Sequence, residues 1–66
     1  MNWKEACEMF TNEILPTIVQ YFEKDGMPDF DARCEAWNDW LAEMHTDALI
    51  GNWELFNWDQ PPCNNY

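Results

Sequence analysis

Two apolar stripes with the spacing of an α-helix constrain this chain more than any other feature of its sequence. One stripe lies on a helix predicted over residues 2–24. The other lies on a helix predicted over residues 30–45 and continues to Ala48, and in both stripes apolar side chains recur every three or four positions. Their members are Trp3, Cys7, Phe10, Ile14, Ile18 and Tyr21 in the first, and Phe30, Cys34, Trp37, Leu41, Met44 and Ala48 in the second. Stripes of similar length with a short connection predict an antiparallel helical hairpin.

Residues that commonly begin and end helices stand at the boundaries of these segments. Asn2 fits an N-cap, and Gly26 fits the left-handed position after a helix end. The second helix is predicted to begin at Asp29 or Asp31. Pro16 lies opposite the first stripe, where proline either bends the helix around its core or divides it into two nearly coaxial pieces.

A third, shorter helix is predicted over residues 52–58. Asn52 can cap it, and Asp59-Gln60-Pro61-Pro62 ends it. The tail comprises residues 59–66, and we expect its last four residues, CNNY, to be either mobile or held by Tyr66. The side chains expected to close the open side of the hairpin are Trp53, Leu55, Phe56 and Trp58. The sequence therefore predicts a single all-α domain over residues 1–66, a small three-helix fold made of a helical hairpin and a short C-terminal helix.

The stretch DARCEAWNDWLAEMHTD, residues 31–47, carries an acid at every fourth position. On a helix this ladder lies opposite the apolar stripe and winds slowly around the outer side. Like charges at this spacing destabilise a helix by about 0.2–0.5 kcal/mol per pair, so the feature lowers stability. A simple solvated face is one interpretation, and a surface for a basic partner is the other. The acids of the ladder are Asp31, Glu35, Asp39, Glu43 and Asp47.

The net charge of the chain is −10, from thirteen acids and three bases. Such a charge disfavours direct contact with nucleic acid or with an anionic membrane, and it favours a basic partner. If the hairpin packs as predicted, the acidic surface is extended by Glu5, Glu8, Glu23, Asp25 and Asp29. Trp40 falls between the core and the acidic side, so part of its ring is expected to reach a partner, whereas Trp37 is assigned to the core.

Catalytic and cofactor-binding motifs are missing from the sequence. It contains no phosphate-binding loop, dinucleotide fingerprint or zinc spacing, and DGMPDFD does not follow the order of a calcium loop. His45, the only histidine, is interpreted as structural. The three cysteines lack a CxxC pair and are expected to be free thiols. We therefore expect no enzymatic activity, no cofactor and no metal site.

The N-terminal residues MNWKEACEMF do not resemble a secretory signal, and no apolar run approaches the ~20 residues of a membrane span. We expect a cytoplasmic protein with no membrane partner. A monomer is predicted because the acidic faces repel each other and the apolar stripes are needed internally. A dimer through the 52–58 helix is the alternative.

Three segments, NWKEACEMF, EAWNDWLAEM and NWELFNWDQPPC, carry a resemblance to small acidic phage-encoded inhibitors of bacterial defence. More narrowly, the chain resembles a short anti-CRISPR protein directed against type I-C CRISPR surveillance complexes. The resemblance implies a DNA-mimicking surface that occupies the DNA-entry or PAM-reading site of the Cas8-type subunit in the bacterial cytoplasm. It carries over no individual binding residue.

The alternative is a small acidic regulatory module, such as an antitoxin, anti-restriction protein or anti-activator. Such a module would bind a basic or hydrophobic partner surface, and it would use an apolar groove or Trp40 instead of the ladder.

Overall fold

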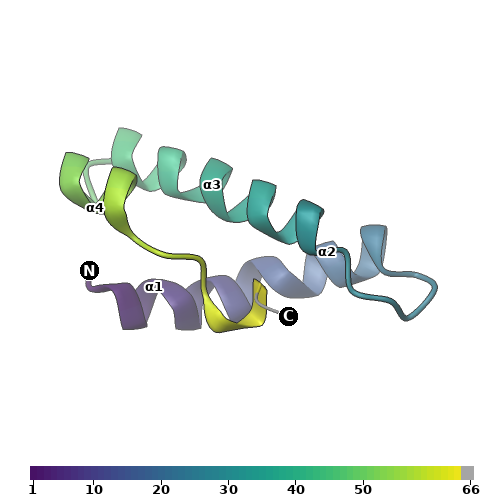
Figure 1. The fold of residues 1–66 in the computed structure, drawn as a ribbon. Coiled ribbons are helices and arrows are strands. Elements are labelled where there is room, and N and C mark those ends of the chain that lie inside the picture. The colour runs from purple at the N-terminus through teal and green to yellow at the C-terminus, as the bar shows by residue number, and fades with distance from the viewer. Residues whose placement is uncertain (65–66) are drawn as a thin grey trace.

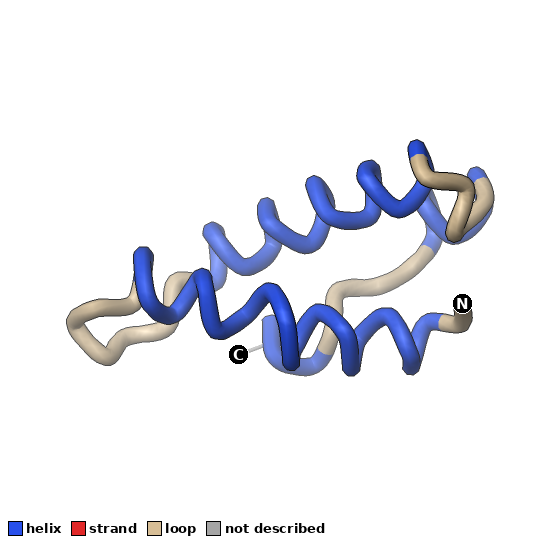
Figure 2. The backbone as a smooth tube through the Cα atoms, turned by 180° about the vertical axis from the view of Figure 1, so that it is seen from behind, coloured by secondary structure: helices blue, strands red, loops and turns tan. Residues whose placement is uncertain are grey.

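The structure, a computed structural model, describes residues 1–64 and is built from helices that form a hairpin with a short closing helix (Figure 1). Figures 1 and 2 show an N-terminal helical rod, residues 3–22, running antiparallel to α3 (Phe30–Thr46). A short helix, α4 (Asn52–Asn57), lies at the end of the hairpin opposite the connecting loop. No strand occurs within the described part, which confirms the all-α three-helix fold. The elements are α1 (Trp3–Met9), a π-helical turn η1 (Phe10–Ile14), α2 (Leu15–Phe22), α3 (Phe30–Thr46), α4 (Asn52–Asn57) and a 3₁₀ turn η2 (Pro62–Asn64).

Helix starts agree with the local signals in the sequence. Asn2 Oδ1 accepts a hydrogen bond from the Glu5 amide at 2.8 Å, and Asp29 Oδ1 accepts one from the Ala32 amide at 3.0 Å. Gly26 has a φ of 81°, as predicted, although it lies in the loop after Phe22. No helix of residues 1–64 is both long and apolar enough to span a membrane.

Pro16 is accommodated by a widened turn. Proline has no N–H to donate to the carbonyl four residues earlier, and its ring crowds that carbonyl. Just before it, the amide of Leu15 bonds to the carbonyl of Phe10, five residues back, which is the pattern of a π turn. The first helix is thus divided into α1 and α2, and Figure 2 shows that the rod continues through the division.

The core is an aromatic cluster contributed by the two arms of the hairpin. The ring of Phe10 meets that of Trp37 edge to face, with centroids 5.3 Å apart. The ring of Trp40 lies 5.5 Å from Trp37 and 6.0 Å from Phe10. Trp37 is fully buried, as predicted, but Trp40 is only 7% exposed. The expectation that Trp40 reaches a partner is therefore wrong, because this ring completes the cluster.

Several apolar side chains that were predicted to be buried, in the two stripes and in the 52–58 helix, are exposed. Tyr21 is 62% exposed, because the last turn of α2 extends beyond the start of α3 (Figure 1). Trp53 and Phe56 are 66% and 79% exposed, because α4 is short and turns its other side, with Leu55, toward the core. Ala48 is exposed because α3 ends before it. These positions were predicted to be buried, and the structure corrects that prediction.

The C-terminal tail packs onto the hairpin through residue 64. Pro61 is fully buried and Asn64 is 4% exposed. Tyr66, which was expected to hold the tail, lies outside the described residues. Asn52 was predicted to cap α4, but Gly51 occupies the N-cap, and its amide donates to Glu54 Oε2 at 2.9 Å.

The chain leaves α3 through an αL residue that is not glycine. Ala48 has a φ of 60°, its amide bonds to the His45 carbonyl at 3.0 Å, and the Leu49 amide bonds to the Met44 carbonyl at 2.9 Å. This hydrogen-bond pair is a Schellman motif, which usually places glycine at the left-handed position. The left-handed backbone costs a residue with a Cβ about 1–2 kcal/mol.

Replacing this alanine should therefore stabilise the fold. We expect Ala48→Gly to raise the free energy of unfolding by about 1 kcal/mol, measured by urea denaturation. The matched control is Ala42→Gly at an exposed position inside α3, which should lower the same quantity by about 1 kcal/mol. A loss of stability in Ala48→Gly would contradict the αL assignment.

Candidate functional site

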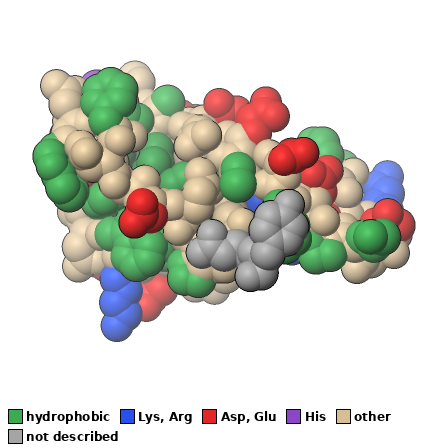
Figure 3. Space-filling view, viewed as in Figure 1, with side chains coloured by type: hydrophobic (Ala, Val, Ile, Leu, Met, Phe, Trp, Pro, Cys, Tyr) green, Lys and Arg blue, Asp and Glu red, His purple; other side chains and the backbone are tan. Residues whose placement is uncertain are grey.

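The acidic ladder forms a continuous exposed face on α3. All five side chains are exposed, and none of them makes a hydrogen bond or ion pair with the described residues. Four lie within the helix, and Asp47 occupies its C-cap. Figure 3 shows acidic side chains along the edge of the molecule that α3 forms. The structure therefore brings together Asp31, Glu35, Asp39, Glu43 and Asp47 as one unpartnered set.

The position of these acids along α3 shows that most of them do not support the helix. A carboxylate near a helix N-terminus is stabilised by the macrodipole, which applies to Asp31 in the first turn. Glu43 and Asp47 lie at the opposite end, where the same dipole disfavours negative charge. The acids at the C-terminal end of α3 therefore lower helix stability, as does the repulsion between neighbours.

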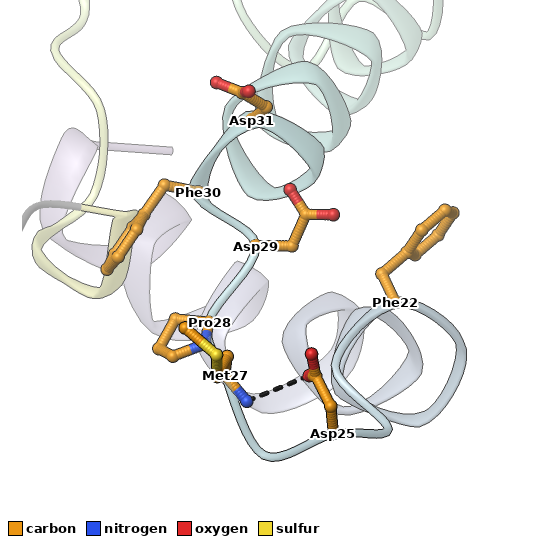
Figure 4. Close-up of a pocket in the computed structure, with 7 residues that line it drawn as sticks. All are labelled: Phe22, Asp25, Met27, Pro28, Asp29, Phe30 and Asp31. Atoms are coloured by element: carbon orange, nitrogen blue, oxygen red, sulfur yellow. Dashed lines mark hydrogen bonds between the residues drawn. The ribbon is translucent and has the colours of Figure 1, made fainter.

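Other acids near the connection between α2 and α3 have local structural roles. Asp25 Oδ1 accepts a hydrogen bond from the Met27 amide at 3.0 Å, and Asp29 caps α3. Both side chains line a hollow of about 490 Å³. Figure 4 shows them with Phe22 on one side and Phe30 on the other. Asp25 is exposed and Asp29 half-buried, so both remain at the margin of the acidic surface.

Glu23 has a different role from the one predicted. It is 8% exposed and forms a bidentate ion pair with Arg33, with Nε to Oε2 and Nη2 to Oε1 both at 2.7 Å. The hydrogen bonds and positive charge of Arg33 hold the pKa of the Glu23 carboxyl below its ordinary value. Glu23 therefore does not extend the acidic surface, and the expectation that it faces outward is wrong.

Arg33 also holds the C-terminal tail. Its Nη1 donates to the carbonyl of Cys63 at 2.6 Å, and its own carbonyl accepts from Asn64 Nδ2 at 3.0 Å. The guanidinium lies 5.4 Å from the centre of the Phe30 ring. Arg33, the only base on α3, is thus turned away from the ladder, and its side chain is 13% exposed. The other two bases, Lys4 and Lys24, lie on other segments.

The histidine and the thiols have structural surroundings. His45 Nε2 lies 2.6 Å from Asn52 Oδ1, which links the end of α3 to the start of α4. All three cysteines are free, as predicted. Burial, and then the proximity of Cys63 and Glu8, raise the pKa of the Cys7 thiol. Residues 1–64 contain no group of three or more histidine, cysteine or acidic side chains that could hold a metal ion.

No protein-family model, curated protein or solved structure matches the chain. The function must therefore be inferred from the charge and geometry of the chain itself.

Two features of the structure were not predicted from the sequence. The first is the ion pair of Arg33, because nothing local links position 33 to position 23. The second is the apolar end of the molecule around α4, where Figure 3 shows hydrophobic side chains gathered. The sequence indicates this apolar end only through the number of large apolar residues over 49–58. One side of a six-residue helix cannot bury all of them.

The ion pair predicts a specific pH dependence of stability. The pKa of Glu23 is lower in the folded state than in the unfolded state. Its carboxylate therefore contributes fully to the free energy of unfolding above the ordinary pKa of 4.5, and this contribution is lost as the pH falls through the folded-state pKa. We expect Glu23→Gln to be less stable than the parent at pH 7, with the difference shrinking as the pH is lowered below about 4. Urea denaturation across this range measures it.

The matched control is Glu13→Gln, an exposed carboxylate without a partner among residues 1–64. It should alter stability little at either pH. A Glu23→Gln deficit of the same size at pH 7 and at pH 2 would show that the pair does not act through the charge of Glu23.

Proposed function

We propose that this chain is a DNA-mimicking inhibitor that occupies the basic DNA-binding surface of another protein with the acidic face of α3. The particular proposal is an anti-CRISPR protein that blocks target-DNA binding, at the PAM-reading site, by a type I surveillance complex of the I-C class. The observation that carries the proposal is the ladder itself. Its five exposed carboxylates have no partner among residues 1–64, and the one arginine of α3 is withdrawn into an ion pair.

The dimensions of the ladder support a contact with a phosphate-binding groove. Sixteen residues of helix between the first and last acid span about 24 Å, at about 1.5 Å per residue. One strand of duplex DNA carries roughly seven phosphates over that length, at about 3.4 Å each. The five carboxylates supply a similar, less dense row of charge. The molecule measures 36 × 21 × 17 Å, and α3, which carries this row, runs along its length (Figure 1).

Electrostatics explains how such a face could compete with DNA. Lys and Arg side chains of a DNA-binding groove attract any extended row of anions, and steering by net charge accelerates the encounter. With Glu23 and Arg33 paired inside, twelve acids and two bases remain, and ten of those acids are exposed. The same charge opposes binding of the chain to DNA, so the chain would act as a competitor of DNA.

A regulatory interaction module is the second candidate. The observation that favours it is the exposure of Trp53 and Phe56, because large apolar side chains left open to solvent often mark protein contacts. In this reading an antitoxin or anti-activator would bind mainly through the α4 end. Trp40 cannot be the contact residue of such a module, because its ring is buried.

A paired charge reversal separates these functions. We expect Asp39→Lys with Glu43→Lys to weaken partner binding at least tenfold while the fold remains intact or gains stability, because repulsion along α3 is relieved. The assay mixes purified type I-C surveillance complex with labelled PAM-containing duplex and titrates the chain. The parent should displace the duplex, and the variant should not. Circular dichroism and thermal melting establish the fold of each variant.

The matched control is Glu8→Lys with Glu13→Lys on the N-terminal helix, which changes net charge from −10 to −6 in the same way. It should retain most of the displacement. Equal losses in both variants would show that total charge, and not the α3 face, governs binding. Full activity of the α3 variant would favour the regulatory module, and capture of the chain without displacement of DNA would indicate a block at a later step.

A further inference from the structure

A small hollow lined with tryptophan lies where the beginning of α1 meets α4 and the segment that follows it. Its volume is about 250 Å³, below the roughly 300–1,000 Å³ of pockets that hold drug-sized ligands. Three of the five tryptophans of the chain line it, together with one amide and one carboxylate. The lining residues are Trp3, Trp53, Asn57, Trp58 and Asp59.

Two hydrogen bonds hold the walls of this hollow in place. Trp3 Nε1 donates to the carbonyl of Asp59 at 3.0 Å, which ties the first helical residue to the segment after α4. Asn57 Nδ2 donates to the carbonyl of Trp53 at 2.8 Å. Trp58 is half-buried and packs against the core, whereas Trp53 is 66% exposed. The walls of the hollow are therefore held by hydrogen bonds and core packing, and the indole of Trp53 is its most exposed wall.

The chemistry of the lining suits a cation. Indole is the aromatic ring that attracts cations most strongly, and a guanidinium also stacks flat against it. The exposed carboxylate of Asp59 supplies a charge-assisted acceptor. Asn57 Oδ1 has no donor among the described residues and can accept a second hydrogen bond. The net charge of −10 adds a field that draws positive groups toward the whole surface.

We propose that this hollow binds one arginine side chain projecting from the basic partner. The inference rests on the proposed function, because it takes the partner to be a basic protein surface. The ladder would then supply long-range attraction, and the tryptophan hollow would supply a short-range anchor. Arginine and tryptophan are both enriched among the residues that dominate binding energy at interfaces.

A second copy of this chain cannot supply the occupant. Its single arginine is Arg33, and the guanidinium of that residue is held by Glu23 and the Cys63 carbonyl. The larger hollow beside the connecting loop is also less suitable. Asp25 and Asp29, which line it, already accept backbone hydrogen bonds, and the Phe30 ring lies against the guanidinium of Arg33.

The test uses the full ¹⁵N-labelled chain and a blocked tripeptide, acetyl-Gly-Arg-Gly-amide, followed through the five indole N–H signals. We expect saturable shifts of the Trp3, Trp53 and Trp58 signals, with a dissociation constant on the order of 1 mM. The indoles of Trp37 and Trp40, which are buried in the core, should not respond. The matched peptide carries citrulline, which keeps the shape of arginine without its charge, and it should not bind.

Variants of the hollow provide a second arm. Trp53→Ala should weaken binding of the arginine peptide about tenfold, and Asp59→Asn should weaken it by a smaller factor. Phe56→Ala removes an equally exposed aromatic ring of α4 that does not line the hollow, and it should leave binding unchanged. Because Trp53 and Phe56 are both open to solvent, neither substitution should unfold the chain, and circular dichroism checks this.

Equal binding of the citrulline peptide, or unchanged affinity in Trp53→Ala, would overturn the inference. Shifts confined to backbone amides of α3 would also overturn it, because they would place the peptide on the ladder. If no arginine peptide binds while displacement of DNA still depends on Asp39 and Glu43, the hollow fails and the proposed function stands. If the peptide binds as expected while the charge reversal on α3 has no effect, the hollow stands without the DNA-mimic function.

Discussion

The bidentate ion pair between Arg33 and Glu23 connects three parts of this small fold. It joins the end of α2 to the first turns of α3, and a third donor of the same guanidinium reaches the tail at the Cys63 carbonyl. A buried pair of this kind is costly to break, because each partner left alone would be a desolvated charge. Two parallel hydrogen bonds and a third to the Cys63 carbonyl give this pair the geometry that favours a charge-assisted contact. The pair also removes the only lysine or arginine of α3 from the surface, so that one interaction both closes the fold and leaves the acids as the charged groups of the outer face of α3.

That face is a liability that the core must offset. Repulsion along the ladder and the unfavourable dipole at the C-terminal end of α3 both lower helix stability. The aromatic cluster of Phe10, Trp37 and Trp40 provides the compensation, because large rings bury much apolar area in a domain too short for an extended core. The π turn before Pro16 and the left-handed Ala48 are two further local costs. Ala48 directs the chain out of α3 toward α4, and thus determines where the apolar end of the molecule lies.

The acidic face and the tryptophan hollow would attract a partner over different distances. Charge acts over a distance set by screening, about 8 Å at physiological salt, whereas indole contacts act only when surfaces touch. A partner with a basic groove and a projecting arginine would satisfy both. Such a division between electrostatic steering and a central aromatic anchor is common in protein interfaces.

The sequence by itself determined the helices, their approximate ends and the outward direction of the ladder. These properties are local: they depend on the helical period and on caps such as Asn2 and Asp29, which act within one turn. Only the tertiary structure decided whether the side chains of Glu23, Trp40 and Tyr21 are buried or exposed, because the burial of each depends on the residues that another segment places beside it. Glu23 is buried because it pairs with Arg33, and Trp40 is buried because it packs against Phe10 and Trp37. Tyr21 is exposed because α3 does not extend over the last turn of α2. Helical periodicity gives the direction of a side chain, but burial requires a neighbour, and neighbours are decided by packing between segments far apart in the chain.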